Sequence, residues 1–215
     1  MEFEVLYRHT DFIAINKPIG IAVHQSEDTE VGLTTRLAAQ IGVPRIWLVH
    51  RLDKTTSGVL LLALNKKAAS LLAEQFALRH IQKTYLALST GKPIKKQGWV
   101  KGDMEKSRRS TWKLIRSHYN PAVTHFCSRS VSPGLRLFVL YPKTGKTHQL
   151  RVAMKSLGSP ILGDTLYGGA SSKRLFLHAW RLKFEYLGQT YFIYAPWDSD
   201  WPEAMANLLS GLGIE

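Results

Sequence analysis

Short stretches that are wholly apolar, or that alternate between apolar and polar residues, recur along the chain with turn residues between them. Such stretches predict β-strands, here over residues 3–7, 12–16, 59–64, 83–88, 110–116, 123–131, 135–141, 175–186 and 189–194. Apolar residues at helical spacing predict helices over residues 33–41, 66–79 and 147–156, and a last helix capped by Ser199 or Asp200. Many strands with few helices between them indicate an α+β fold with a mixed, mostly antiparallel sheet.

The composition is that of a folded protein, because 45% of the 215 residues are hydrophobic and 10% are aromatic. No apolar run is long enough to cross a bilayer, and Glu2 and Glu4 stand where a signal peptide needs a basic start. Cys127 is the only cysteine, so an internal disulfide is impossible and a reducing compartment suits the chain. We therefore expect a cytoplasmic protein that does not contact a membrane.

The formal net charge of +13 favours a polyanionic partner. The charge is concentrated, since residues 79–116 hold eleven Lys and Arg against Asp103 and Glu105, a net charge of +9. A concentrated basic segment indicates nucleic acid more strongly than the total charge does. We expect Arg108 and Arg109 to bind RNA phosphates; the alternative is a solvated loop whose charge only aids solubility.

The polar segment 50–58, with the sequence HRLDKTTSG, stands directly before the aliphatic strand at 59–64. Its Thr, Ser and Gly residues predict a turn. A carboxylate on a loop beside a rigid strand is a common position for a catalytic group, which makes Asp53 a candidate. Taken alone, Asp53 is better explained as a loop carboxylate that binds its own turn or pairs with Arg51.

The whole segment resembles the signature of the RluA-type pseudouridine synthases, followed as in that family by an aliphatic strand. Residues 16–20 (NKPIG), 83–85 (KTY) and 145–151 (GKTHQLR) resemble three further motifs of the family. The resemblance covers nearly the whole chain and implies the pseudouridine synthase fold, with helices and loops around a central active-site cleft. Because the motifs begin near residue 12, it also implies one catalytic domain over residues 1–215, without a separate RNA-binding domain ahead of it.

The resemblance implies a role for three residues in the reaction. Asp53 is the catalytic carboxylate, and Arg151 is the ion-pair partner that keeps it charged. Tyr85 stacks on the flipped base and assists proton transfer near C5. A tyrosine on a strand or an arginine on a helix surface would otherwise be read as structural.

Other residues are expected to bind the substrate or to shape the cleft. Leu150 is a wall of the uracil pocket, and His50 contacts the substrate. Arg51 fills the gap left by the flipped nucleotide or binds a phosphate. Residues 16–20 with His24, and residues 158–168 with Asp164, are expected to be structural.

The expected activity is isomerisation of a specific uridine in structured RNA, ribosomal or transfer, by a monomer without metal or nucleotide cofactor. The target base must be flipped out of its helix to be reached. One alternative is a non-catalytic RNA-binding or RNA-folding protein on the same fold, which the basic segment would also suit. A nucleotide-hydrolysing protein is the third possibility, because residues 143–147 (KTGKT) resemble the end of a phosphate-binding loop, but Leu140 replaces its first glycine. The eight histidines show no spacing typical of a metal site.

Overall fold

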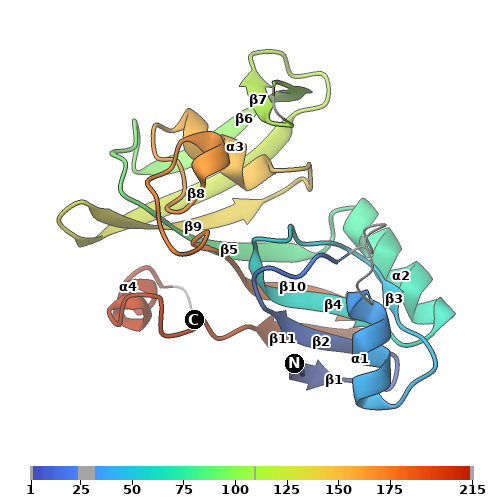
Figure 1. The fold of residues 1–215 in the computed structure, drawn as a ribbon. Coiled ribbons are helices and arrows are strands. Elements are labelled where there is room, and N and C mark those ends of the chain that lie inside the picture. The colour runs from blue at the N-terminus through green and yellow to red at the C-terminus, as the bar shows by residue number, and fades with distance from the viewer. Residues whose placement is uncertain (1, 24–31, 109, 214–215) are drawn as a thin grey trace. The chain divides into compact units, whose positions relative to one another are not determined.

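The computed structural model describes residues 2–23, 32–108 and 110–213, and the chain divides into two compact units (Figure 1). Unit 1 consists of Met1–Lys83 and Ala179–Pro196, and unit 2 consists of Thr84–His178 and Trp197–Glu215. Each unit therefore combines segments that are far apart in the sequence. The single domain over residues 1–215 stays a prediction.

The sheet of unit 1 follows the order β1 (Glu4–Arg8), β2 (Phe12–Lys17), β4 (Ser57–Ala63), β10 (Leu177–Tyr186) and β11 (Gln189–Tyr194). The short strand β3 (Trp47–Leu48) also pairs with β4. The pairs β1–β2, β2–β4, β3–β4 and β10–β11 are antiparallel. Every residue of β4 is buried, because the strand lies between β2 and β10, and this explains its uninterrupted aliphatic sequence.

Two helices flank the sheet of unit 1. Helix α1 (Leu33–Ile41) ends at Gly42, whose φ of 71° is the left-handed conformation favoured by glycine. Helix α2 (Lys66–Ala77) begins after Asn65, whose side chain accepts a hydrogen bond from the Ala68 N–H at 2.9 Å. Its apolar side packs against a core formed by β2, β4, β10 and β11. Both helices were predicted from the sequence, and Ala68 and Leu72 are the buried residues of α2.

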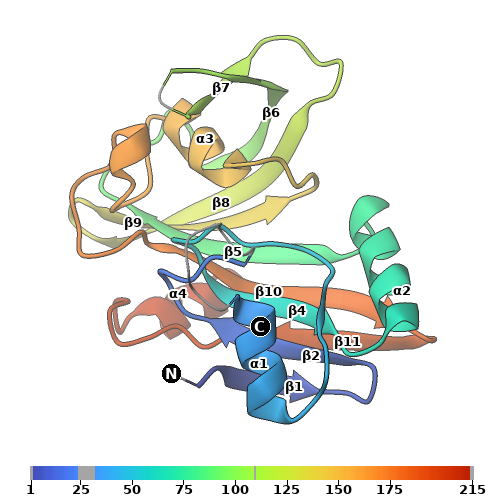
Figure 2. The same ribbon diagram turned by 45° about the vertical axis from the view of Figure 1, so that its right-hand side comes forward.

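The sheet of unit 2 follows the order β5 (Gln82–Ser89), β9 (Leu135–Pro142), β8 (Ala122–Ser132), β6 (Gln97–Lys106) and β7 (Trp112–Ile115). Its neighbouring strands are antiparallel. Helix α3 (Gln149–Ser156) packs with one face of these strands into a second core, and Figures 1 and 2 show it beside β6 and β8. The predominance of antiparallel strands over helices confirms the α+β prediction.

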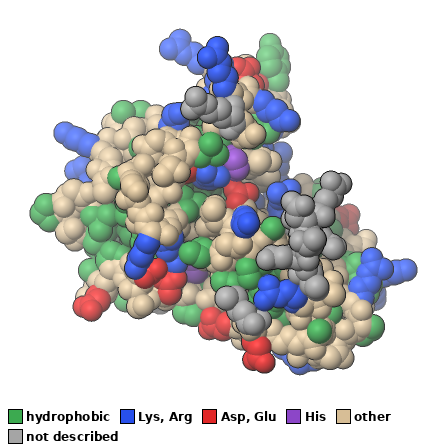
Figure 3. All heavy atoms as spheres, in the orientation of Figure 1, with side chains coloured by type: hydrophobic (Ala, Val, Ile, Leu, Met, Phe, Trp, Pro, Cys, Tyr) green, Lys and Arg blue, Asp and Glu red, His purple; other side chains and the backbone are tan. Residues whose placement is uncertain are grey.

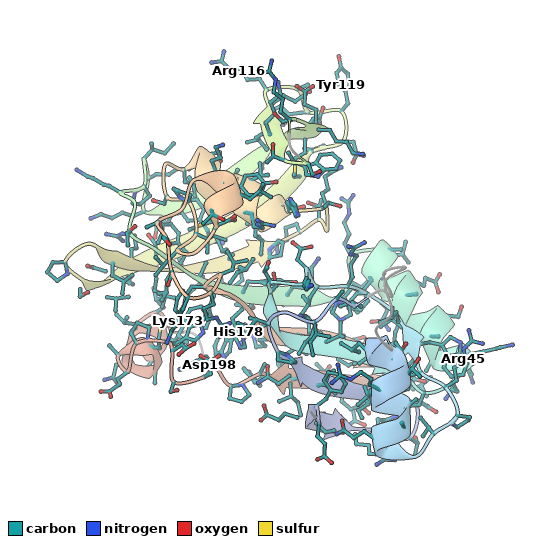
Figure 4. All side chains as sticks on the ribbon, viewed as in Figure 1. Arg45, Arg116, Tyr119, Lys173, His178 and Asp198 are labelled. Atoms are coloured by element: carbon teal, nitrogen blue, oxygen red, sulfur yellow. The ribbon has the colours of Figure 1, made fainter. Side chains whose placement is uncertain are left out.

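Two features of unit 2 differ from the prediction. Strand β6 was missed, because its sequence QGWVKGDMEK holds two glycines and little apolar alternation. Helix α4 (Met205–Ser210) begins after Ala204, so the predicted cap at Ser199 or Asp200 is wrong. Asp200 instead pairs with Lys173, and Figure 4 shows Lys173 and Asp198 close to α4. None of the helices that the structure describes is long and apolar enough to span a membrane.

Candidate active site

The segment 50–58 lies in unit 1 as a loop between β3 and β4, with a turn at Lys54 and Thr55. The Asp53 carbonyl accepts a hydrogen bond from the Thr56 N–H at 3.0 Å, and the Asp53 side chain is half-buried. Arg51 is exposed, and among the residues that the structure describes these two do not form an ion pair with each other. The loop thus holds Asp53 beside a fully buried strand, with part of its carboxylate side chain open to solvent.

Gly58 has a packing reason to stand in this segment. Its φ is 112°, and a Cβ at this position would lie 2.2 Å from the carbonyl oxygen of Ala179 in β10. Any side chain would therefore separate β4 from β10 and move the loop that precedes β4. The close packing of the sheet therefore requires the glycine of the signature.

Lys17 supports the Asp53 loop, and the sequence indicated only a structural role for residues 16–20 as a whole. It is fully buried, and its Nζ donates hydrogen bonds to the carbonyls of Pro18 at 2.8 Å, Ile21 at 2.9 Å and Lys54 at 3.4 Å. The Gly20 N–H also donates to the Lys54 carbonyl, at 2.8 Å. Residues 16–20 therefore support the loop that carries Asp53, which is the structural role expected of them.

The Lys17 ammonium is also a positive charge that acts on Asp53. Burial lowers the pKa of Lys17 to about 8, and the attraction of the Asp53 carboxylate opposes this shift. Lys17 consequently remains mostly charged at neutral pH. A lysine directly before proline at the end of a buried strand was the signal available in the sequence.

The side chain of His50 has a structural role in unit 1. Its Nε2 accepts a hydrogen bond from the Leu61 N–H of β4 at 2.9 Å, and its ring stacks on Phe76 of α2 with centroids 4.3 Å apart. Burial, with a smaller contribution from the charge of Lys83, lowers the pKa of His50 to about 3, so the ring is neutral. Since Nε2 is the acceptor, Nδ1 carries the proton. Substrate contact by His50 stays a prediction, and it would have to use Nδ1.

In unit 2, the loop before α3 is fixed by the side chain of Gln149. Its Oε1 accepts hydrogen bonds from the Thr144 hydroxyl at 2.6 Å and the Lys146 N–H at 3.0 Å. Its Nε2 donates to the Val123 carbonyl at 3.1 Å and the Thr124 hydroxyl at 3.0 Å on β8. The polar residues of the 145–151 motif thus hold the start of α3 against the sheet.

Arg151 forms a bidentate ion pair with Asp164. Its Nε and Nη2 donate to the two carboxylate oxygens at 2.8 and 2.7 Å, and 1% of the Asp164 side chain is exposed. The Arg151 guanidinium also lies over the Tyr167 ring, 4.9 Å from its centroid. Asp164, expected only to shape the cleft, is thus a direct partner of Arg151. The pairing of Arg151 with Asp53 would join the two units and stays a prediction.

Tyr167 connects Arg151 to the basic segment. Its hydroxyl accepts a hydrogen bond from the N–H of Trp112, the first residue of β7, at 3.0 Å. The same hydroxyl lies 2.7 Å from Nδ1 of His148, which adopts a left-handed φ of 56° before α3. The ring of Tyr167 is buried. One side chain therefore ties the strand after Arg108 to the helix that carries Arg151.

Tyr85 and Leu150 belong to the same cluster of unit 2. Tyr85 lies on β5 opposite Leu140 of β9, is half-buried, and packs against the core that includes Leu150. Leu150 is 8% exposed. The structure therefore brings these two predicted residues together, while their contact with a base stays a prediction.

The later part of the basic segment forms the hairpin of β6 and β7 in unit 2, which we call the basic hairpin. Arg108 is exposed in the loop between β6 and β7, where its carbonyl accepts hydrogen bonds from the Thr111 N–H at 3.2 Å and hydroxyl at 2.7 Å. Arg109 and His24 lie outside the described residues. Figure 3 shows Lys and Arg side chains projecting from the part of the surface where Figure 1 places β6 and β7. In Figure 4, Arg116 and Tyr119 project from the loop that follows β7.

The comparison with protein families identifies the family of the chain. The family model described as RNA pseudouridylate synthase matches residues 11–156, which include Asp53, Tyr85 and Arg151. The chain belongs to the RNA pseudouridylate synthase family. It is thereby assigned to isomerases that modify RNA.

Relatives and a solved structure agree with this family. The chain is 59% identical over 189 residues to a Haemophilus influenzae protein named "Uncharacterized RNA pseudouridine synthase". The matched region covers 87% of this chain and 84% of that protein. It is 40% identical over 184 residues to a ribosomal large subunit pseudouridine synthase C of Rickettsia bellii, but spans only 61% of that protein's length and 81% of its own. The human RNA pseudouridylate synthase domain containing 1 has the same fold, with a TM-score of 0.78, 26% identity, and coverage of 100% of this chain and 96% of that one.

Among the residues that the structure describes, His, Cys, Asp and Glu side chains do not form a group of three or more that could bind a metal ion.

Proposed function

We propose that the chain isomerises a specific uridine of a structured RNA, with Asp53 as the catalytic carboxylate. In this reaction the bond between N1 and C1′ breaks and a bond between C5 and C1′ forms. The C5 hydrogen leaves as a proton and N1 takes up a proton, so the product is an isomer of the substrate. The target nucleotide is flipped out of its helix, because these atoms are inaccessible in a stacked base.

The observation that carries this proposal is the support of the Asp53 loop. The Lys54 carbonyl of the loop accepts hydrogen bonds from the buried Lys17 ammonium and from the Gly20 N–H, and Gly58 approaches β10 closely at the end of the loop. A half-buried carboxylate is thereby held next to a positive charge. A nucleophilic or basic carboxylate must be ionised and held in place. A loop that only connected two strands would not need a buried lysine to hold it.

The remaining predicted residues have complementary roles. Tyr85 stacks on the flipped base and moves the C5 proton, with Leu150 as a pocket wall. Arg151, oriented by Asp164, pairs with Asp53 during the reaction. Arg51, together with Arg108 and Arg109 of the basic hairpin, contacts the RNA backbone.

The partner is ribosomal or transfer RNA. The Rickettsia bellii relative is named for the large ribosomal subunit, which supports ribosomal RNA as the first substrate to test. A monomer without metal or nucleotide cofactor stays our prediction, as does the cytoplasm, where a lone cysteine remains reduced. A comparison of the pseudouridines in RNA from wild-type and deletion cells would identify the target.

The decisive experiment replaces Asp53 with Asn and measures tritium release from RNA labelled at uridine C5. The change is isosteric and removes the charge, so turnover should fall by several orders of magnitude while stability and RNA affinity stay nearly unchanged. Glu185→Gln, an exposed carboxylate on β10, is the matched control and should retain full activity.

An Asp53→Asn variant that keeps a tenth of the activity would overturn the role of Asp53. If the variant instead restored every phenotype of a deletion strain while it bound RNA normally, the non-catalytic RNA-binding function would replace our proposal.

A further inference from the structure

Three aromatic side chains form a row across the sheet of unit 2. Trp99 on β6 lies opposite His125 on β8, and His125 lies opposite Tyr141 on β9. Their ring centroids are 4.9 Å and 5.7 Å apart, respectively. Residues directly opposite each other on neighbouring strands point to the same face of a sheet. We call Trp99, His125 and Tyr141 the aromatic row.

The face that carries the aromatic row is the more open one at this part of the sheet. Along β8, Thr124 and Phe126 are buried, and Phe126 belongs to the core beneath α3. His125 and Cys127, which alternate with them, are only half-buried. Trp99 exposes 44% of its surface. An exposed tryptophan in line with two further rings marks a contact surface, because exposed apolar side chains usually occur singly.

Two lysines lie on the same face of the sheet, each two residues further along the chain than a ring of the aromatic row. Lys101 lies opposite Val123 on β8, and the Lys143 N–H donates to the Val123 carbonyl at 2.8 Å. Residues two apart on a strand share a face and lie about 7 Å apart, so these lysines flank the aromatic row. The Lys101 ammonium is 5.0 Å from the Trp99 centroid. Burial, and to a lesser degree Lys143, lowers the pKa of His125, so its ring is neutral at pH 7.

We propose that the aromatic row is a stacking platform for a single-stranded segment of the RNA substrate, with Lys101 and Lys143 as contacts to its phosphates. Every base has a π-face, so bases stack on aromatic side chains with little regard to sequence, and nearby cations follow the backbone. The partner is RNA rather than a protein because the rings are bordered by like charges that a polyanion complements. The nearest acid along β6 is Asp103, whose carboxylate accepts hydrogen bonds from the Ser117 hydroxyl and from the N–H groups of Tyr119 and Asn120 in the loop after β7.

This inference rests on the proposed function, because it takes RNA as the partner, but it names a surface apart from the 50–58 segment. It is tested by binding, in the Asp53→Asn background, so that turnover does not enter the measurement. The probe is a fluorescein-labelled oligouridylate about ten nucleotides long, within the range of single-strand binding sites. Fluorescence anisotropy gives its Kd.

Trp99→Ala is expected to weaken binding of this probe at least about fivefold, the effect of losing one stacked base. Trp99→Phe keeps a ring and should retain most of the affinity. Lys101→Gln and Lys143→Gln should each lower the slope of log K against log salt by about 1.

Phe192 provides a matched control in unit 1. It is 50% exposed on β11, and the Lys183 ammonium lies 5.1 Å from its ring centroid, so it presents a similar exposed ring beside a lysine in the other unit. Phe192→Ala should bind the probe like its parent. An unchanged Kd in Trp99→Ala, or an equal loss in Phe192→Ala, would overturn the stacking platform.

Ultraviolet crosslinking of the wild-type protein to the same probe tests the proposal even if the Trp99→Ala variant does not fold. A crosslink on residues 97–101, or on the strands that carry His125 and Tyr141, is the expected result, and crosslinks confined to other segments would count against the proposal. The two proposals can fail separately. Activity of Asp53→Asn would refute the catalytic assignment and leave the binding result standing, whereas unchanged binding in Trp99→Ala would leave the catalytic assignment standing.

Discussion

Replacing Asp164 with Asn should destabilise the protein through Arg151. The guanidinium donates two hydrogen bonds, of 2.8 and 2.7 Å, to the two carboxylate oxygens, and the exposed fractions of the side chains are 10% for Arg151 and 1% for Asp164. Asn keeps one acceptor oxygen and turns an NH₂ group toward the other guanidinium nitrogen. A buried positive charge would then lack its counter-charge.

The expected loss follows from the burial of this pair. Removing one partner of a buried ion pair typically costs about 3–5 kcal/mol. Asp164 also accepts a hydrogen bond from the Tyr167 N–H at 3.3 Å at the start of the turn Thr165–Tyr167, and Asn can preserve this contact. In a chain of this size 1 kcal/mol corresponds to about 2–4 °C in Tm. We therefore expect Tm to fall by roughly 6–20 °C.

Thermal unfolding followed by circular dichroism measures this loss, at low and at high salt. Screening by salt acts mainly on exposed charges, so the difference in Tm should change little between the two conditions. Glu105→Gln is the control, because Glu105 and Lys113 form an exposed pair at 2.7 Å on β6 and β7. That variant should lose less than about 1 kcal/mol. Equal Tm values for both variants would refute a stabilising buried charge pair.

Three further predictions concern other residues. Tyr85→Phe should bind RNA normally and slow the product-forming step in single-turnover assays; unchanged turnover would restrict Tyr85 to stacking or packing. Arg108→Glu should weaken RNA binding and flatten its salt dependence, whereas Arg45→Glu, an exposed arginine of unit 1, should not; an unchanged slope would indicate a solvated loop. The pKa of Lys17 falls from 10.5 to about 8 on folding, so between these values the unfolded chain holds more protons and stability rises with pH, by up to about 3 kcal/mol. In urea titrations, the stability of Lys17→Met should therefore rise less between pH 8 and 10.5 than that of the wild type. A part of the rise should remain, because the pKa of Lys83 is also lowered to about 8.

Elements with local signals were predictable from the sequence. Helix α1 has the predicted bounds because Gly42 ends it in the left-handed conformation, and α2 starts at the predicted Lys66, directly after its Asn65 cap. Strand β6 was not predictable, since its conformation depends on its partners. A Cβ at Gly102 would lie 2.5 Å from the Ile115 carbonyl oxygen of β7, so this glycine serves a close strand contact. Alone in a sequence, it suggests a turn.

The candidate site was also predictable only in part. The motif residues were recognisable, because each stands in a short, ordered pattern of polar residues. Their contacts were not recognisable, because the bonded residues are far apart in the sequence. Lys17 and Lys54 of the Asp53 loop are 37 positions apart, and Arg151 and Asp164 are 13 positions apart. Burial decides both contacts. A buried ammonium requires acceptors and a buried carboxylate requires donors, and only the folded chain determines which groups are within reach.

In our proposal two cations with different properties act on Asp53, Lys17 of the same unit and Arg151 of unit 2. Arg151 is always charged, but Asp164 already balances that charge and occupies two of its five N–H groups. A pairing with Asp53 would have to use the remaining donors. Lys17 has no carboxylate as a hydrogen-bond partner among its described contacts, which are carbonyl oxygens. Its charge consequently acts on Asp53 before any substrate is bound, and that charge is lost above a pH of about 8.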